Sequence, residues 1–334
     1  MKSTVTLKDI AKILNVSIST VSKALNNSYE ISEETTKKVK ELAESLNYIP
    51  NDVARSLKSN VTKRIGVIVP NVLDDFFAKI IHAIEREANK LNYKLIICLS
   101  NDVLTKEADS VSFLLNGSVD GILISLAEET QNKNNFDHFK NLTNRNFPLV
   151  MFDRVSEEIT CDKITVNDFE ATYDAVKYLV KTNCKHIAFL STIANTSVGE
   201  LRTKGYCKAL KDELSASPNL INISDYEKFE SILGTALQHN KIDGLITADQ
   251  LSAICAINII QKKGLHVPND IAVIGFTDGA IPKYTLPSLT TINQKPEEMG
   301  KLAFKTLLKR IQNNDRGIKD IVIETELVKR ASTY

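Results

Sequence analysis

The first fifty residues contain three short amphipathic helical patterns separated by tight turns, an arrangement that restricts this segment to a small helical bundle. Thr6 and Asp9 form a capping box before the first pattern, Ser17 can cap the second, and Ser32 and Thr35 can cap the third. Apolar residues recur at helical intervals within each pattern and predict a small core, made of Leu7, Ile10, Ala11 and Leu14, then Val21, Ala24 and Leu25, then Val39, Leu42, Ala43 and Leu46.

The first two of these helices, joined by a tight turn, predict a helix-turn-helix, whose second member normally lies in the major groove of DNA. Serine and asparagine bond base edges, isoleucine contacts a thymine methyl group, and lysine binds a guanine edge or a phosphate. An alternative is that the polar residues merely solvate a surface helix. The exposed side of the second helix and its end carry Ile18, Ser19, Ser22, Lys23, Asn26 and Asn27.

A helix-compatible octet follows at residues 51–58, with Asn51 or Asp52 as its cap. Helices shorter than about 12 residues are marginal by themselves in water, so this segment needs a partner or a DNA surface to fold. We therefore expect a hinge between the helical head and the rest of the chain.

Charge and hydropathy place the chain among ordinary globular proteins. It is 43% hydrophobic and 25% charged, and no apolar run approaches the roughly 20 residues that span a bilayer. The amino terminus lacks the apolar core of a signal peptide, so we expect a cytoplasmic protein. Residues 1–64 contain eleven basic and seven acidic residues, whereas the whole chain carries only +1. This small local surplus favours localised phosphate contacts over general polyanion binding.

No catalytic, metal or cofactor site is predicted. The five cysteines form an odd number without CxxC spacing, which favours reduced and mostly buried thiols. The five histidines are scattered without metal-ligand spacing, and neither a GxSxG nor an HExxH motif occurs. The Gly300-Lys301 pair lacks the upstream glycine of a phosphate loop. An enzyme fused to a DNA-binding head is a remote alternative, which turnover of a nucleotide with a sugar would support.

From Arg64 onward, strand and helix patterns alternate in two successive series, which predicts an α/β fold with parallel sheets covered by helices. Two series predict two similar lobes. We divide the chain into a head at 1–50, a hinge and linker at 51–63, and a core at 64–334. Within the core, we assign residues 64–162 and 294–322 to lobe 1, and residues 163–293 and 323–334 to lobe 2.

Polar and aromatic residues follow the predicted strands, where open parallel sheets bind ligands. Aromatic rings to stack on, together with carboxylate, amide and guanidinium groups, suit a polyhydroxylated sugar. The predicted effector-binding residues are Asn71, Phe76, Phe77, Asp153, Arg202, Asp249, Gln250, Thr277 and Asp278; Asp74, Arg154, Asn195 and Thr196 stand at similar positions.

Four motifs in order and at matching spacing resemble the LacI-GalR family of transcriptional regulators: TLKDIA at 6–11, VSISTVSKALN at 16–26, LNYIPN at 46–51 and ARSL at 54–57. The resemblance implies a helix-turn-helix head, a hinge helix and a core like periplasmic sugar-binding proteins. It places Ile18 and Ser19 at the positions that vary with operator sequence, and Leu57 at the leucine that wedges between base pairs. A buried linker leucine is the alternative for Leu57. The residues expected to contact DNA are Thr6, Ser17, Ile18, Ser19, Thr20, Ser22, Lys23, Asn26, Ala54, Arg55, Leu57 and Lys58.

The resemblance also implies roles in the core. Arg202, in the run RTKGY at 202–206, matches an arginine that holds the effector, and Phe76 and Phe77 match a stacking pair. Thr277 stands where many members have a ligand-binding aspartate, which is a departure. Three alternatives concern single residues: Arg202 as an ion pair on the lobe surface, Phe77 as a core residue, and Asp249 as a helix cap.

Together these features predict a homodimeric DNA-binding regulator that acts as a repressor, binds a pseudo-palindromic operator and responds to a sugar effector. A nucleoside or purine effector is the first alternative. A sugar receptor without a transcriptional role and an architectural DNA protein without an effector are two others.

Overall fold

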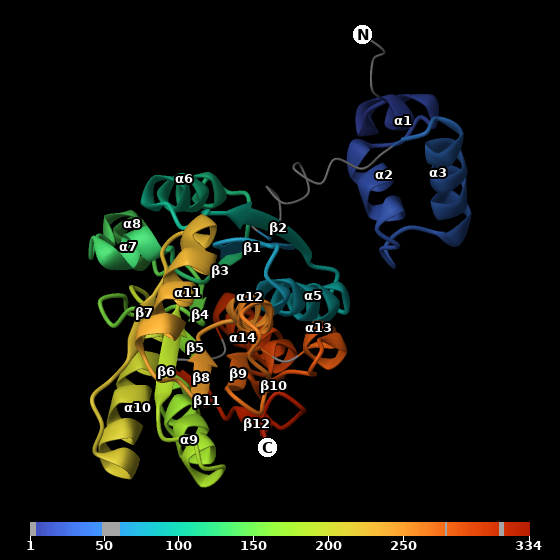
Figure 1. Cartoon of the computed structure of the whole chain (residues 1–334). Helices are drawn as coiled ribbons and strands as arrows, with labels where there is room; N and C mark the ends of the chain where they lie inside the picture. The colour runs from blue at the N-terminus through green and yellow to red at the C-terminus, as the bar shows by residue number, and fades with distance from the viewer. Residues whose placement is uncertain (1–4, 49–60, 278, 314–316) are drawn as a thin grey trace. The chain divides into compact units, whose positions relative to one another are not determined.

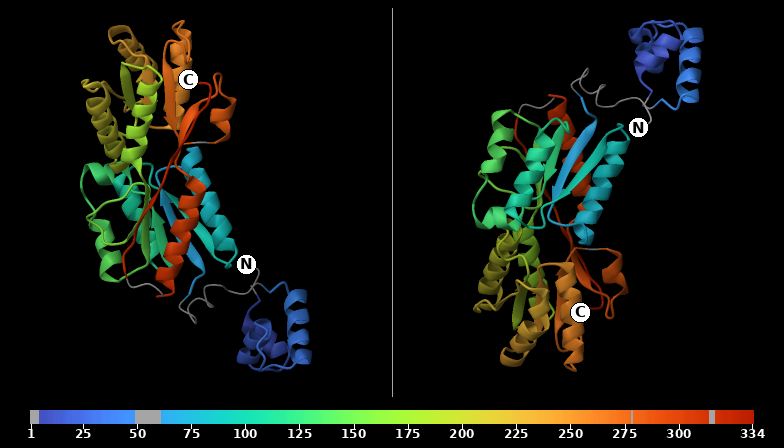
Figure 2. Two further views of the ribbon diagram at one scale, coloured as in Figure 1. Left: turned by 90° about the horizontal axis from the view of Figure 1, so that it is seen from below. Right: turned by 90° about the horizontal axis from the view of Figure 1, so that it is seen from above.

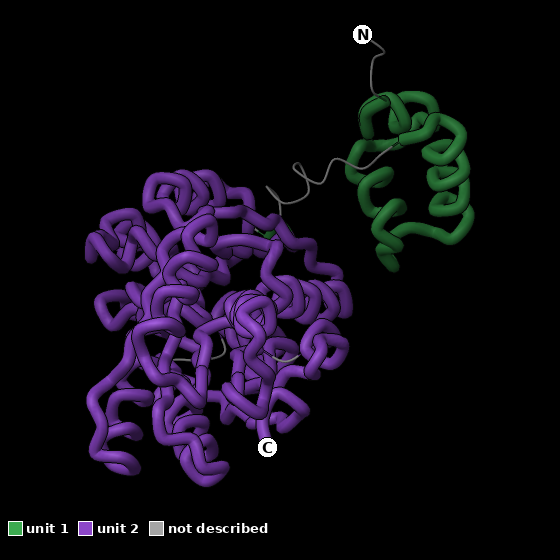
Figure 3. Tube along the Cα trace, viewed as in Figure 1, with its two compact units in different colours: residues 1–62 green, residues 63–334 purple. Residues whose placement is uncertain are grey.

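The computed structural model describes residues 5–48, 61–277, 279–313 and 317–334. The chain divides into two compact units, residues 1–62 and residues 63–334 (Figure 3). The predicted hinge helix at 51–58 lies outside the described residues, as does the predicted head boundary at residue 50. Within the described ranges, no helix combines the length and the apolar character that crossing a membrane requires.

The amino-terminal unit contains the three predicted helices, α1 (Leu7–Ile13), α2 (Ile18–Leu25) and α3 (Glu33–Ser45). Each begins at the predicted cap: the Thr6–Asp9 capping box is present, and Ser17 and Ser32 accept hydrogen bonds from backbone amides of their helices. Ile10, Val21, Ala24 and Val39 are fully buried between the three helices. The helix-turn-helix fold follows from these local signals.

Lobe 1 of the core is built on a six-stranded parallel sheet in the order β11-β5-β4-β3-β1-β2. Its strands are β1 (Arg64–Val69), β2 (Lys94–Leu99), β3 (Gly121–Ile124), β4 (Leu149–Phe152), β5 (Asp162–Val166) and β11 (Asp320–Ile323). One face packs on α5 (Asp75–Asn89) and α14 (Pro296–Ile311). The other packs on α6 (Leu104–Leu115), η1 (Asp137–Phe139) and α8 (Lys140–Asn144), while α7 (Glu128–Asn132) follows β3.

Lobe 2 contains a second six-stranded sheet in the order β12-β10-β9-β8-β6-β7 (Figures 1 and 2). Its strands are β6 (Ile187–Ser191), β7 (Leu220–Asn222), β8 (Gly244–Thr247), β9 (Ala272–Phe276), β10 (Thr290–Asn293) and β12 (Glu326–Val328). Helices α9 (Asp168–Lys181) and α10 (Ser197–Leu214) cover one face. The other face packs on α11 (Phe229–His239) and α12 (Gln250–Lys262), and η2 (Tyr226–Lys228) and α13 (Ala280–Tyr284) complete the lobe.

The chain passes between the two sheets after β5, after β10 and after β11. The predicted start of lobe 2 at residue 163 differs from this arrangement, because β5 pairs with β4 and β11 in the first sheet. A strand pattern does not reveal which sheet completes its hydrogen bonds, so the boundary lies after Val166. The predicted α/β core with parallel sheets is confirmed. The second sheet has one antiparallel pair at its edge, between β12 and β10.

Gly205 allows α10 to approach α9 closely. A Cβ atom at this position would lie 2.2 Å from the backbone oxygen of Phe169, in α9. Real side chains do not tolerate so short a contact, and correcting it would require the two helices to separate. The close approach matters for the site because Arg202 stands one turn before Gly205 on α10.

Candidate functional site

The exposed face of α2 presents the side chains that the sequence predicts for DNA contact. Ile18 is 48% exposed although it is apolar, and Ser19 and Asn26 also face solvent. An aliphatic side chain can contact a thymine methyl group while neighbouring hydroxyl and amide groups bond base edges. The geometry of α2 is therefore suited to a major groove, and the individual contacts stay predictions.

Several of these residues also have local structural roles. Ser17 Oγ accepts a hydrogen bond from the Thr20 backbone amide at 3.0 Å, and Thr6 caps α1. Lys23 is paired with Glu30, and both side chains are nearly half exposed. Exposed pairs of this kind contribute little to stability, so Lys23 can move to a phosphate at small cost. The predicted contacts from Ala54, Arg55, Leu57 and Lys58 lie outside the described residues.

A cavity of about 50 Å³ lies between the two lobes, at the carboxyl ends of both sheets. This is the edge of an open parallel sheet at which ligands bind. Lobe 1 lines the cavity with Asp74, Phe76, Phe77, Asp153 and Arg154; the rest of the lining is Ile193, Val198, Arg202, Ala248, Asp249, Thr277 and Gln294. A larger hollow of about 350 Å³ opens beside Asp162 and Arg310, but its lining in the described part of the chain contains none of the predicted effector residues.

Arg202 is only 3% exposed and is held on three sides. Its Nε donates to Asp168 Oδ1 at 2.7 Å, its Nη1 donates to the Ala248 carbonyl, and its Cζ lies 3.6 Å from the centre of the Phe276 ring. Burial raises the pKa of Asp168, and the Arg202 charge opposes that rise. The alternative of an ion pair is correct, but the pair is buried rather than on the lobe surface. The remaining N–H groups of Arg202 can serve a ligand in the cavity.

Asp153 is a buried carboxylate in an unusual backbone conformation. Its φ of 60° lies in the left-handed region, and Oδ2 accepts a hydrogen bond from Ser125 Oγ at 3.2 Å. Burial raises the pKa of Asp153 to about 6, although the charges of Arg154 and Arg202 and the Ser125 hydrogen bond act against that rise. Asp153 therefore changes its charge near neutral pH and can accept or donate a hydrogen bond at the cavity.

Two further carboxylates line the cavity from opposite lobes. Burial raises the pKa of Asp74, and the negative charge of Asp249 adds to the rise. Asp249 caps α12 by accepting from the Ser252 amide at 2.8 Å, and it also accepts from the Thr192 hydroxyl at 2.6 Å. The helix-cap alternative for Asp249 is thus correct, and Asp249 lines the cavity as well. A ligand with several hydroxyl donors would reduce the mutual repulsion of these acids.

The aromatic and neutral residues of the cavity belong partly to the lobe cores. Phe76 and Phe77 are both buried in the lobe 1 core, with an edge-to-face ring contact and centroids 5.4 Å apart. The core alternative for Phe77 therefore describes its packing, although both rings also line the cavity. Thr277, at a φ of 71°, donates from Oγ1 to Gln294 Oε1 at 2.7 Å.

Two predicted effector residues are not brought to the cavity. The side chain of Asn71 accepts from the amides of Leu73 and Asp74, which shapes the turn before α5. Gln250 is buried in the first turn of α12, and its Nε2 has no hydrogen-bond partner in the described structure. Asp278 lies outside the described residues.

Sequence reasoning misses Asp168, Ile193, Val198, Ala248 and Gln294. Asp168 and Gln294 carry a usable signal, because each is a polar residue just after a strand. The three apolar residues carry no such signal, and their place in the lining depends on how the lobes meet.

Two family models match this chain. "Bacterial regulatory proteins, lacI family" covers residues 6–51, and "Periplasmic binding protein-like domain" covers residues 176–333. The first coincides with the helix-turn-helix unit, and the second covers most of lobe 2 and the carboxyl-terminal crossings. These two matches agree with the resemblance that the sequence motifs indicate.

Individual proteins are similar over nearly the whole chain. The HTH-type transcriptional repressor PurR of Aliivibrio fischeri is 34% identical over 337 residues, which cover 98% of both chains. The ribose operon repressor of Haemophilus influenzae is 32% identical over 333 residues, again with 98% of both chains covered. A lac repressor dimer bound to operator and the anti-inducer ONPF superposes with a TM-score of 0.86, at 25% identity and 99% coverage of both chains. With its head, its two-lobed core and these relatives, the chain belongs to the lacI family of bacterial regulatory proteins.

Proposed function

We propose that this protein is a DNA-binding repressor whose operator affinity changes when a small polyhydroxylated effector, a pentose such as ribose, binds between the core lobes. The observation that carries this proposal is the cavity at the carboxyl ends of both sheets, where buried Arg202 faces acids from both lobes. The ribose operon repressor among the relatives supports the sugar, and several relatives named PurR support a purine as the second candidate. As an operator-bound regulator, it would act in the cytoplasm.

The chemistry of the lining favours a sugar over a flat base. Asp74, Asp153 and Asp249 offer several acceptors for hydroxyl protons, and Arg202 offers donors to hydroxyl or ring oxygens. The Phe76 and Phe77 rings can contact the apolar side of a sugar ring. A cavity of about 50 Å³ is well below the roughly 300 Å³ of ordinary ligand sites, so we infer that the lobes separate to admit the effector.

A second copy of the chain would complete the regulator. Leu73 is 95% exposed, and Tyr284 and Leu286 are each 85% exposed, which is unusual for large apolar side chains. These residues belong to neighbouring segments: Gly279 lies against Asp75 and Lys79 of α5, and Gln261 of α12 donates to the Leu286 carbonyl. A dimer formed through this surface would contact both lobes, so a change in the angle between lobes would alter the spacing of the two heads.

Effector class can be tested by thermal unfolding of the full chain with D-ribose, D-xylose, hypoxanthine and adenosine. A ligand at 100 times its Kd stabilises the folded state by about 2.7 kcal/mol, which raises the Tm by several degrees. We expect D-ribose to raise the Tm and to change operator affinity in a gel-shift titration. A higher Tm with hypoxanthine, and an unchanged Tm with either sugar, would favour the purine candidate. A stabilising sugar that leaves operator affinity unchanged would contradict the gating.

Operator reading can be tested with the double variant Ile18→Ala, Ser19→Ala. Both side chains are exposed on α2, so the Tm should remain near that of the natural chain. Base contacts contribute about 1–3 kcal/mol each, so the loss of two should weaken binding to a duplex selected from a random pool by about 30-fold or more. Ser45→Ala, at an exposed position of α3, is the matched control and should bind normally. Equal duplex affinity of the double variant and the control would show that α2 is not the helix that reads the operator.

A further inference from the structure

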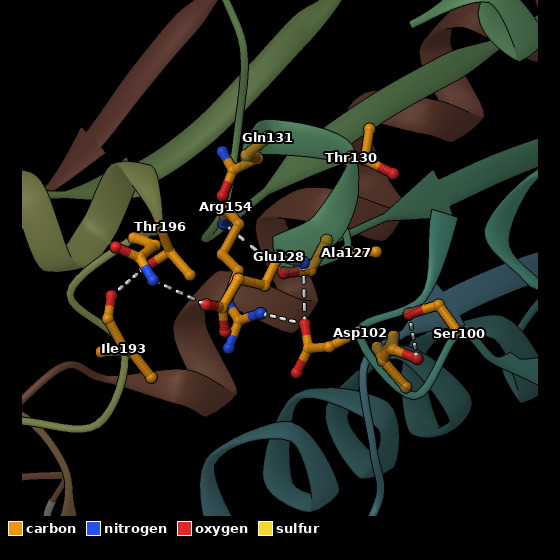
Figure 4. A network of polar contacts seen from close by, with 12 residues as sticks. Ser100, Asp102, Ala127, Glu128, Thr130, Gln131, Arg154, Ile193 and Thr196 are labelled. Atoms are coloured by element: carbon orange, nitrogen blue, oxygen red, sulfur yellow. Dashed lines mark hydrogen bonds and ion pairs between the residues drawn. The ribbon is translucent and has the colours of Figure 1, made fainter. Parts of the chain in front are cut away.

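Lobe 1 reaches across to the first turn of α10 through a group of hydrogen bonds beside the effector cavity (Figure 4). The side-chain Oε1 of Gln131, in α7, accepts from the Ser197 backbone amide at 3.2 Å. The Val155 amide donates to Ser197 Oγ at 3.3 Å, and Asn195 Nδ2 donates to Glu128 Oε1 at 3.3 Å. Three contacts therefore join the loop after β4 and helix α7 of lobe 1 to the start of α10 in lobe 2.

The Gln131 side chain supplies a hydrogen-bond acceptor that helix α10 cannot supply for its own first amide. Ser197 is the first residue of α10, and the amides in the first turn of a helix have no partner inside the helix. Thr196 Oγ1 caps the Gly199 amide at 3.0 Å, and Gln131 accepts from the amide of Ser197. When the lobes separate, the Ser197 amide must exchange this partner for water.

Helix α7 is held firmly on the lobe 1 side. Buried Glu107 accepts from the Ala127 amide at 2.5 Å, from Thr130 Oγ1 at 2.7 Å, and pairs with His138 Nε2 at 2.8 Å. Gln131 Nε2 donates to the Val155 carbonyl at 3.0 Å, which orients its amide so that Oε1 faces Ser197. The acceptor is therefore preorganised, and little side-chain entropy is lost when the lobes close.

A second anchor joins this helix to the cavity wall. Asp102 Oδ1 accepts from the Glu128 amide at 2.9 Å and pairs with Arg154, which lines the cavity. In Figure 4, Arg154 and Glu128 lie next to each other, and dashed lines join both of them to Asp102. Val155 and Ser197 are also the chain neighbours of Arg154 and Val198, two residues of the cavity lining. The contacts therefore close one rim of the cavity.

We propose that Gln131, supported by Glu128, is a positioning residue that latches lobe 1 to α10 and thereby holds Arg202, five residues beyond Ser197, in its effector-binding place. The latch favours the closed arrangement of the lobes. The expected effect of this latch on effector affinity rests on the proposed function. The expected protection of the Ser197 amide from exchange does not.

The test measures hydrogen–deuterium exchange of the Ser197 amide in the full chain, resolved with overlapping peptides. Gln131→Ala should speed this exchange about fivefold, because one hydrogen bond contributes a factor of this order. Gln131→Glu keeps an acceptor next to a helix amino terminus but loses the Nε2 donor to the Val155 carbonyl, so it should restore part of the protection. Gln238→Ala, at an exposed position of α11, is the matched control and should leave the exchange unchanged. A folded Gln131→Ala variant with wild-type exchange at Ser197 would overturn the latch.

D-ribose provides the second measurement. If it binds the natural chain, Gln131→Ala should raise its Kd about fivefold, mainly through faster dissociation, and Gln131→Glu should reverse part of this loss. If D-ribose fails to bind the natural chain, the sugar proposal fails while the exchange result still decides the latch. Should Gln131→Ala not fold, Asn195→Ala removes the Glu128 contact from an exposed position, and faster Ser197 exchange is expected there as well; unchanged exchange would count against the latch.

Discussion

Replacing Arg202 with alanine is expected to abolish effector binding and to destabilise the core. The change removes the only described charge partner of Asp168 within the cavity wall, and both side chains are 3% exposed. Leaving one member of a buried ion pair without its partner costs about 3–5 kcal/mol. Chemical denaturation should therefore show a lower free energy of unfolding, and isothermal titration should show no binding of the effector that stabilises the natural chain.

A second variant separates these two effects. Replacing the pair together, by Arg202→Met with Asp168→Leu, removes both buried charges and retains apolar packing over Phe276. Such replacements are often close to neutral in stability, so the double variant should regain most of the lost free energy. It should still fail to bind the effector. Recovery of binding in the double variant would show that Arg202 has a structural role only.

Replacing Asp153 with asparagine is expected to stabilise the core at neutral pH while it weakens effector binding. The pKa of Asp153 is raised to about 6, above its unfolded value near 3.8, so the folded state holds this proton more tightly. The contribution of protonated Asp153 to the free energy of unfolding is then fully present below about pH 4, and it is lost as the pH rises to about 6. The loss is about 3 kcal/mol, from about two pKa units at 1.36 kcal/mol each.

Asparagine suits this test because it tolerates the left-handed backbone at a φ of 60°. Free energies of unfolding should diverge between pH 4 and pH 6, with Asp153→Asn more stable by up to about 3 kcal/mol at pH 7.5. Asp109→Asn, on the exposed side of α6, is the control and should follow the natural chain at every pH. Parallel curves for Asp153→Asn and the natural chain would mean that burial does not hold the Asp153 proton.

Sequence patterns predicted the helical head well because its signals are local. Thr6, Ser17 and Ser32 cap helices through bonds that span three residues, so composition and spacing are enough to place the helix starts. Likewise, the alternation of buried strands and amphipathic helices predicted two α/β lobes, since each element shows its own period. The prediction that polar residues after strands line a cleft also placed Arg202, Asp153 and Asp249 at the cavity.

Local sequence patterns do not predict which strands pair when the partners are far apart in the chain. The sheet that contains β5 is chosen by hydrogen bonds to β4 and β11, and β11 lies more than 150 residues later in the chain. Asn71 also follows a strand, but its side chain satisfies nearby amides instead of facing the cavity. A position after a strand indicates the correct edge of a sheet, whereas competition between hydrogen-bond partners decides where each side chain points.

By itself, the amino-acid sequence determined the helix-turn-helix, the two α/β series and the family, because these depend on local periodicity, capping and motif spacing. The tertiary structure alone decided that Arg202 pairs with Asp168 inside a buried wall and that Gln131 reaches the first amide of α10. Those contacts join segments that are far apart in the chain. Their strength depends on burial and on the exclusion of water, which exist only after the two lobes have packed together.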